Sequence, residues 1–286
     1  MITRLAKRGM AVAAYAGHRA AGSAQLRQIL FNAIRLNRIE IERLRQREEF
    51  RFLAYVFANR DKSRSQILQD LWVCYELGER RDGFFVEFGA TNGVVNSNTW
   101  LLERKYGWTG VLAEPNPIWR PKLVISRNAA IDYRCVHADT GRRVGFVVTD
   151  SSDPELSCIA EFAGDDHSAH LRAKGTEIEV ETVSLDDLLD QHHAPAEISY
   201  LSIDTEGSEL AILSSFDFSR RVVDLISVEQ NPTTEPQIEA LLAGHGYLRV
   251  FPEFSQWDGW YVRADRRDAR ARLGSEVAAP LAAVLP

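Results

Sequence analysis

The 286-residue sequence contains only three cysteines, Cys74, Cys135 and Cys158. Their number is odd and no two of them have C-x-x-C spacing, so they form neither a disulfide framework nor a cysteine-based zinc site. Isolated thiols of this kind are typical of a reducing compartment. We therefore expect a cytoplasmic protein.

Long apolar runs and an excess of positive charge are also absent. No run reaches the roughly 18 apolar residues that a membrane-spanning helix requires. The formal net charge of -6 at pH 7 argues against nucleic-acid binding, because that function needs dense positive charge to neutralise phosphates. The chain is 45% hydrophobic, which is ordinary for a globular protein with a buried core.

The first 63 residues differ in character from the rest of the chain. Before Glu40 they contain seven Lys or Arg residues and no acid. Apolar residues at helical spacing predict helices here, so we interpret residues 1–63 as an N-terminal helical extension. Three roles stay open: helices that cap the core or pair it into a homodimer, a basic amphipathic helix on an anionic membrane surface, and a secretory signal.

From residue 64 to 264, short apolar runs alternate with helical stretches. This alternation predicts βαβ units and a parallel sheet, and runs that are apolar throughout predict strands buried on both faces. We expect a Rossmann-like α/β fold, with a seven-stranded sheet and helices on both faces. The expected strands are 84–88, 110–114, 131–136, 200–204, 224–229, 247–251 and 260–263, the last two antiparallel to each other.

Helices are predicted between these strands, and two segments fall outside the alternating pattern. Residues 144–183 contain strand-like pieces of their own, and we interpret them as an insertion over the active site that contributes to acceptor specificity. Residues 265–286 are interpreted as a C-terminal tail. The predicted helices are 66–77, 99–105, 117–126, 208–213 and 234–243.

Acidic residues and glycines follow the first two predicted strands, where doubly wound sheets bind their ligands. Gly89 allows the backbone to turn and to approach a ligand closely, since it has no side chain. The helix start near Asn98 offers backbone N–H groups to a carboxylate or another anion. Glu114 ends the second strand, where a carboxylate can accept both hydroxyls of a ribose.

Glu87 separates two kinds of nucleotide site. A dinucleotide site requires G-x-G-x-x-G, whereas this chain has Gly89-x-x-x-Gly93. A carboxylate beside a pyrophosphate would be repelled, but Glu87 can pair with the α-amino group of S-adenosylmethionine. We therefore favour S-adenosylmethionine over the cofactor of an NAD-dependent dehydrogenase. The predicted cofactor-binding residues are Glu87, Gly89, Ala90, Asn92, Gly93, Asn98, Thr99, Glu114 and Asp139, the last as a candidate contact to the adenine amino group.

Oxygen-bearing side chains also follow the fourth and fifth predicted strands. Because neighbouring strand ends lie about 5 Å apart, these groups can converge on one point. One hypothesis is that Asp204, Glu229 and Asn231 hold Mg²⁺ or Mn²⁺, which prefer oxygen ligands. The other is that Asp204 or Glu206 acts as a general base without a metal. Glu206 can instead serve only to stabilise the dipole of the following helix.

Two further groups are candidates for contact with the acceptor. His167 and His170 lie in the predicted insertion beside two aspartates. Trp257 and Trp260 offer ring faces for a sugar, although aromatic residues in a closing strand more often belong to the core.

The sequence resembles the FkbM family of methyltransferases over about residues 64–263. The resemblance implies S-adenosylmethionine as donor and usually an O-methyl product, often on a sugar or natural-product hydroxyl. It also marks Gln230 as a candidate catalytic position, because relatives are expected to carry His there. We therefore expect an O-methyltransferase with a small-molecule or glycan acceptor; a catalytically silent S-adenosylmethionine-binding partner is the alternative. The matching stretches are 83–93, 97–99, 102–103, 107–110, 114–116, 183–189, 228–231 and, most specifically, Leu-Ser-Ile-Asp-Thr-Glu-Gly-Ser-Glu at 201–209.

Overall fold

The computed structural model describes residues 46–149, 154–164 and 169–267, together with the single residues Gln28, Phe31 and Arg43. Most of the predicted N-terminal extension and the tail after residue 267 therefore lie outside the described residues. Within the described part, no helix combines the length and the apolar character needed to cross a membrane.

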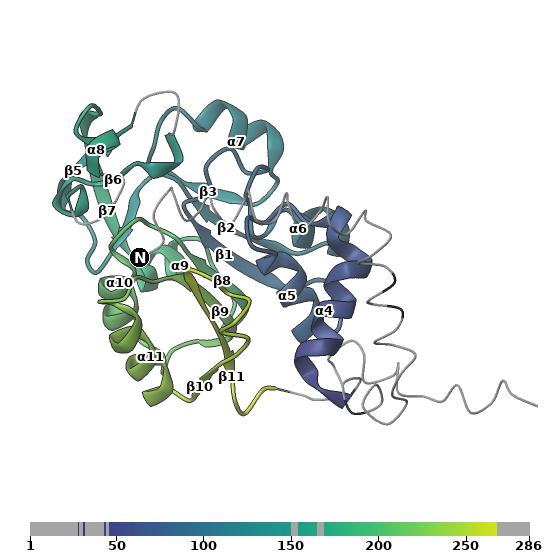
Figure 1. Cartoon of the computed structure of the whole chain (residues 1–286). Helices are drawn as coiled ribbons and strands as arrows, with labels where there is room; N and C mark the ends of the chain where they lie inside the picture. The colour runs from purple at the N-terminus through teal and green to yellow at the C-terminus, as the bar shows by residue number, and fades with distance from the viewer. Residues whose placement is uncertain are drawn as a thin grey trace, which may run out of the picture.

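A seven-stranded sheet forms the centre of the molecule, with the order β10-β11-β9-β8-β1-β2-β3 (Figure 1). β1 pairs in parallel with both β2 and β8, and β11 runs antiparallel to its neighbours β9 and β10. This arrangement confirms the predicted Rossmann-like α/β fold. The strands are β1 (Phe84–Phe88), β2 (Thr109–Ala113), β3 (Ala130–Asp132), β8 (Glu197–Ile203), β9 (Val222–Glu229), β10 (Tyr247–Arg249) and β11 (Asp258–Arg263).

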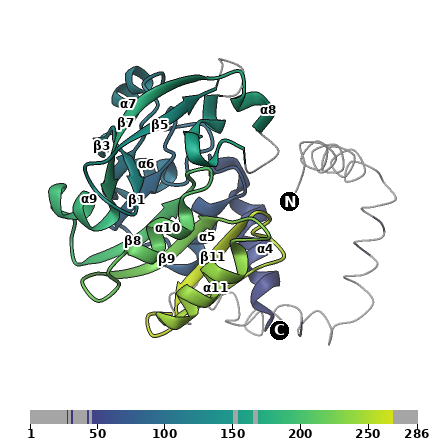
Figure 2. The same ribbon diagram turned by 90° about the vertical axis from the view of Figure 1, so that its left-hand side faces the viewer.

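Helices cover both faces of this sheet (Figures 1 and 2). Successive side chains of a strand point to opposite faces, so Phe85 packs with the helices of one layer and Val86 with those of the other. The first layer contains α4 (Glu48–Asn59), the 3₁₀ turn η1 (Arg60–Lys62), α5 (Gln69–Glu76), α6 (Trp100–Tyr106) and α7 (Arg120–Ser126). The second contains α9 (Leu185–Gln191), α10 (Glu209–Ser215) and α11 (Glu235–Gly244).

The predicted third strand, 131–136, is divided between two sheets. Asp132 accepts hydrogen bonds from both the backbone and the guanidinium of Arg134, and the chain turns between β3 and β4. A single continuous strand was therefore wrong. The second sheet has the order β4-β7-β5-β6 and consists of β4 (Cys135–His137), β5 (Arg143–Val148), β6 (Cys158–Ile159) and β7 (Thr176–Ser184), with η2 (Pro154–Leu156), η3 (Ala160–Phe162) and α8 (Ala169–Arg172) between them.

Candidate functional site

A cleft of about 1390 Å³ lies at the carboxyl ends of β1, β2, β8 and β9. This is the edge at which parallel sheets bind their ligands. The second sheet and its connections close part of the cleft, since Phe146, Phe162 and His170 line it as well. The predicted site residues that line it are Gly89, Asn92, Asn98, Glu114, Asp204, Glu206, Glu229, Gln230 and Asn231.

Gly89 shapes the floor of this cleft. Its φ of +70° lies in the left-handed region, and a Cβ atom there would collide with the carbonyl oxygen of Asp204. Its N–H donates to the carbonyl of Ala113 at 3.1 Å. The turn after β1 is therefore pressed between the ends of β2 and β8, and a side chain at this position is excluded.

Glu114 is a buried carboxylate that lines the cleft. Its two oxygens each accept one backbone hydrogen bond, from Thr91 and from Asn116, both at 2.8 Å. Burial raises its pKa to about 7, against the lowering effect of these two hydrogen bonds. Each oxygen keeps a second lone pair, so the carboxylate can still accept two hydroxyl donors.

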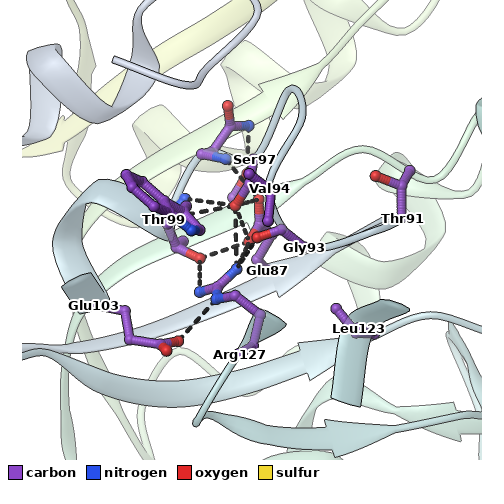
Figure 3. A network of polar contacts seen from close by, with 12 residues as sticks. Glu87, Thr91, Gly93, Val94, Ser97, Thr99, Glu103, Leu123 and Arg127 are labelled. Atoms are coloured by element: carbon purple, nitrogen blue, oxygen red, sulfur yellow. Dashed lines mark hydrogen bonds and ion pairs between the residues drawn. The ribbon is translucent and has the colours of Figure 1, made fainter. Parts of the chain in front are cut away.

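Glu87 does not line the cleft, and the prediction that it binds an α-amino group is corrected. Its carboxylate is buried and accepts hydrogen bonds from the N–H of Asn98 at 2.6 Å and from the hydroxyl of Thr99 at 2.5 Å (Figure 3). Arg127 pairs with it at 3.4 Å and with Glu103 at 2.8 Å. Glu87 therefore braces the loop after β1 instead of facing a ligand.

The backbone N–H groups at the helix start predicted to bind an anion already donate to side chains of the protein. The hydroxyl oxygen of Ser97 accepts the N–H groups of Thr99 and Trp100, and Glu87 accepts that of Asn98. Figure 3 shows these contacts converging around Ser97 and Glu87. A ligand carboxylate consequently finds no unoccupied N–H among these three.

Four other predicted cofactor residues lie away from the cleft lining. Ala90 is buried in the core, and Thr99 is buried against Glu87. Gly93 packs so closely that a Cβ atom would meet Arg127 at 2.7 Å. Asp139 has a half-exposed side chain that pairs with Arg142 at 3.4 Å, which corrects its assignment to the adenine amino group.

Three carboxylates meet at the ends of β8 and β9. Asp204, Glu206 and Glu229 each offer one oxygen, and these oxygens lie within 4.8 Å of one another. Burial raises the pKa of Glu229 well above its ordinary value, and the negative charges of Asp204 and Glu206 raise it further. The cluster therefore favours uptake of a proton or the approach of a cation.

Glu209 shapes the turn that carries Glu206. Its carboxylate accepts the N–H groups of Thr205 at 2.9 Å and of Gly207 at 3.0 Å. Both Glu206 and Gly207 have positive φ, at 59° and 134°. Glu209, which also lines the cleft, therefore fixes the backbone that carries Glu206.

Residues of the predicted insertion, 144–183, contact both sides of the cleft. Arg172, whose side chain is buried, donates to Glu206 at 2.7 Å and to the carbonyl of Leu156 at 2.7 Å. On the other side, the amide of Asn116 donates to Ser157 at 3.1 Å. Sequence reasoning missed Arg172, because no local pattern links it to a partner 34 positions away.

The two residues after β9 have other partners than predicted. The side-chain oxygen of Asn231 accepts the N–H groups of Thr233 and Thr234 and so stabilises the start of α11. Glu206 lies beside Asp204 and Glu229, and the ligand set of Asp204, Glu229 and Asn231 stays a prediction. Gln230 is buried, and its carbonyl accepts the hydroxyl of Tyr261 at 3.1 Å.

Of the four residues predicted to contact the acceptor, two line the cleft. His170 and Trp257 line the cleft, whereas His167 lies outside the described residues. Trp260 is buried and stacks on Trp72, with ring centroids 5.1 Å apart. It therefore belongs to the core and is not available to a sugar.

Comparison with known proteins identifies the family. Residues 87–261, more than half of the chain, match the model of the methyltransferase FkbM domain. No curated protein gives a significant match. The match to the FkbM domain favours methyl transfer over the dehydrogenase interpretation and implies S-adenosylmethionine as the donor.

Solved structures with a similar fold include two methyltransferases. One is precorrin-6y C5,15-methyltransferase from Geobacter metallireducens GS-15, at 12% identity over 63% of this chain and 71% of that chain, with a TM-score of 0.36. The other is a proposed RNA methyltransferase from Pyrococcus horikoshii, at 11% identity over 69% and 82%, with a TM-score of 0.35. Both TM-scores are low, so the assignment rests on the match in sequence: the chain belongs to the FkbM family of methyltransferases.

Proposed function

We propose that this protein is an S-adenosylmethionine-dependent O-methyltransferase acting on a hydroxyl of a saccharide or secondary metabolite. The observation that carries the proposal is the position of Glu229, a carboxylate with a raised pKa in the same cleft as Glu114. A hydroxyl is a poor nucleophile while it keeps its proton, so its methylation needs a base or a metal ion. The cleft is also larger than a typical single-ligand pocket, which leaves room for donor and acceptor together.

The donor end of the cleft fits a nucleoside. S-adenosylmethionine, when bound, supplies a methyl group that its positively charged sulfonium has already activated. Glu114 offers one lone pair on each oxygen to the two ribose hydroxyls, since Thr91 and Asn116 occupy the others. The turn at Gly89 keeps the backbone low enough for close approach of the ligand.

The acceptor end contains the candidate bases. Glu206 is paired with Arg172 at 2.7 Å, so its carboxylate is already engaged in an ion pair. Glu229 takes up a proton more readily, because burial and the charge of Asp204 raise its pKa. We therefore assign Glu229 as the general base, in place of Asp204 or Glu206, and Asp204 as the neighbour that increases its basicity.

The same three carboxylates also fit a divalent cation. Mg²⁺ and Mn²⁺ prefer carboxylate oxygens, and one oxygen of each of the three carboxylates lies within 4.8 Å of the other two. Asp204, Glu206 and Glu229 would hold the ion, which would lower the pKa of the acceptor hydroxyl. This arrangement is the second version of the proposal, and it replaces the Asn231 ligand by Glu206.

The test is methyl transfer from S-adenosylmethionine to a panel of sugars and hydroxylated metabolites, followed by mass spectrometry and by NMR location of the new methyl group. Glu229→Gln is expected to lower kcat by about 10²–10⁴-fold while S-adenosylhomocysteine binds as before. A chelator that abolishes activity, restored by Mn²⁺, would select the metal version; an unaffected rate would select the base.

Two results would contradict the proposal. Methylation found on nitrogen or carbon would remove the O-methyl assignment. Binding of S-adenosylhomocysteine with no product from any acceptor would instead favour the catalytically silent partner module.

A further inference from the structure

The methyl-transfer cleft is lined by many acids, but a ligand carboxylate finds no cation inside it. Among the described residues that line the cleft there is no lysine or arginine. The helix start that was predicted to bind an anion is occupied by Ser97 and Glu87. Arginine side chains are found instead in the pocket that borders the cleft. The acids that line the cleft are Glu114, Glu155, Asp204, Glu206, Glu209 and Glu229.

A smaller pocket of about 380 Å³ adjoins the cleft and contains two arginines, Arg60 and Arg64. Gln66, Val95 and Asn96 line both cavities, so the two lie next to each other. A ligand that lies in the cleft can therefore extend into the smaller pocket past these three residues. The pocket is large enough for a carboxylate or phosphate group.

The guanidinium of Arg64 is oriented by the Trp100 ring, which does not occupy its N–H groups. Its Cζ lies 5.2 Å from the centre of the Trp100 ring. An arginine stacked on an aromatic face keeps the N–H groups of its plane available for a planar anion. Within the described part of the chain, neither Arg60 nor Arg64 forms an ion pair.

The backbone around Arg64 is held in place by buried hydrogen bonds. Asp70, fully buried, accepts from the N–H of Arg64 at 3.0 Å and from the hydroxyl of Ser63 at 2.6 Å. Ser65 forms a parallel β-bridge with Asn96 and donates its hydroxyl to the carbonyl of Ser97 at 3.2 Å. These contacts fasten the arginine segment to the loop that borders the cleft, so the two walls of the pocket are preformed.

We propose that Arg60 and Arg64 form an anion subsite, which binds a carboxylate or phosphate group of a ligand whose other end lies in the methyl-transfer cleft. The inference rests on the proposed function, because it requires the cleft to hold a donor or an acceptor. One source of the anion is the α-carboxylate of S-adenosylmethionine. The other is an acidic group on the acceptor, such as the phosphate or carboxylate of a modified sugar.

The first arm of the test compares two donor analogues by calorimetry. S-adenosylhomocysteine carries the α-carboxylate, and 5′-methylthioadenosine lacks the whole amino-acid portion. If the donor supplies the anion, Arg64→Gln weakens S-adenosylhomocysteine binding about tenfold or more and leaves 5′-methylthioadenosine binding unchanged. Arg143→Gln is the matched control, because it removes one exposed positive charge in β5, away from the pocket.

The second arm titrates inorganic phosphate into the protein loaded with S-adenosylhomocysteine. If the acceptor supplies the anion, Arg64→Gln and Arg60→Gln bind S-adenosylhomocysteine normally but lose the phosphate binding of the parent protein. Variants that match the parent in both arms would overturn the subsite. Equal weakening of both donor analogues, without loss of phosphate binding, would also overturn it, since that result indicates a general distortion of the cleft.

The two proposals fail in distinguishable ways. A parent protein that does not bind S-adenosylhomocysteine, but whose phosphate binding depends on Arg64, would retain the anion subsite and lose the proposed function. Normal binding of S-adenosylhomocysteine by the parent protein, with no effect of either arginine substitution, would retain the proposed function and rule out the anion subsite.

Discussion

Arg172 and Glu206 form an ion pair at 2.7 Å across the boundary between the inserted segment and the central sheet. Phe162, from the same inserted segment, lies so close to Gly207 that a Cβ atom at that glycine would meet it at 2.7 Å. The acidic turn after β8 is thus completed by residues that precede it by more than thirty positions. The side of the cleft that contains Asp204, Glu206 and Glu229 depends on this contact.

Removal of Arg172 is expected to destabilise the protein. The Arg172→Met variant leaves Glu206 without this partner in a largely buried site, which should lower the free energy of unfolding by about 3 kcal/mol. Urea denaturation measures the change. Arg143→Gln, which removes an exposed ion pair, should cost at most about 1 kcal/mol, and equal losses in the two variants would contradict the structural role of Arg172.

Glu87 and Glu114 are expected to separate stability from donor binding. Glu87→Gln disrupts the buried pair with Arg127 and should lower the free energy of unfolding by about 3 kcal/mol, with little change in affinity for S-adenosylhomocysteine. Glu114→Gln should instead weaken that affinity about tenfold to a hundredfold. Chemical denaturation and calorimetry on both variants decide the matter. Donor binding that depends on Glu87 as strongly as on Glu114 would restore the assignment made from sequence.

The affinity for S-adenosylhomocysteine is expected to depend on pH through Glu114. Burial raises the pKa of this carboxyl to about 7, and the ribose hydroxyls need the ionised form as acceptor. The dissociation constant should therefore be constant above pH 7 and rise about tenfold per unit below it. Calorimetry between pH 5 and pH 7.5 (about the range below the α-amino pKa) measures this, and Glu114→Gln should give a flat profile.

The same pKa has a predicted effect on folding. Because the folded state raises the pKa above its ordinary value of 4.5, folding favours the protonated carboxyl. The contribution of Glu114 to the free energy of unfolding is therefore fully present below about pH 4.5 and is lost as the pH rises through 7. Parent protein and Glu114→Gln compared in urea at several pH values should differ in this direction.

Gly89→Ala is expected to disturb both the fold and the donor site. The new methyl group would collide with the carbonyl of Asp204, and the φ of +70° is strained for any residue with a side chain. We expect a loss of about 2 kcal/mol or more in the free energy of unfolding, together with weaker binding of S-adenosylhomocysteine. Gly141→Ala, where nothing lies within 4 Å at a similar φ of +83°, measures the cost of the backbone strain alone.

The sequence determined most of the central sheet and, to within one residue, the carboxyl ends of β1, β2, β8 and β9. Continuous apolar runs predicted the strands, because a strand buried on both faces is apolar at successive positions along the chain. The placement of Glu114, Asp204 and Glu229 in one cleft followed from the same pattern, since parallel strands end at one edge. For these residues, local sequence was sufficient.

Tertiary structure alone decided which of the acids face a ligand. Glu87 lies near the end of β1 and Glu114 directly follows the neighbouring strand β2, and Arg127, forty positions beyond Glu87, pairs with the buried Glu87 carboxylate. Arg172 likewise determines that Glu206 is held in an ion pair. The turn at Asp132 places the second half of the predicted strand 131–136 in the other sheet. The position of each of these acids depends on a charged partner that packing brings from elsewhere in the chain. Hydrophobic periodicity in the sequence does not predict such a partner.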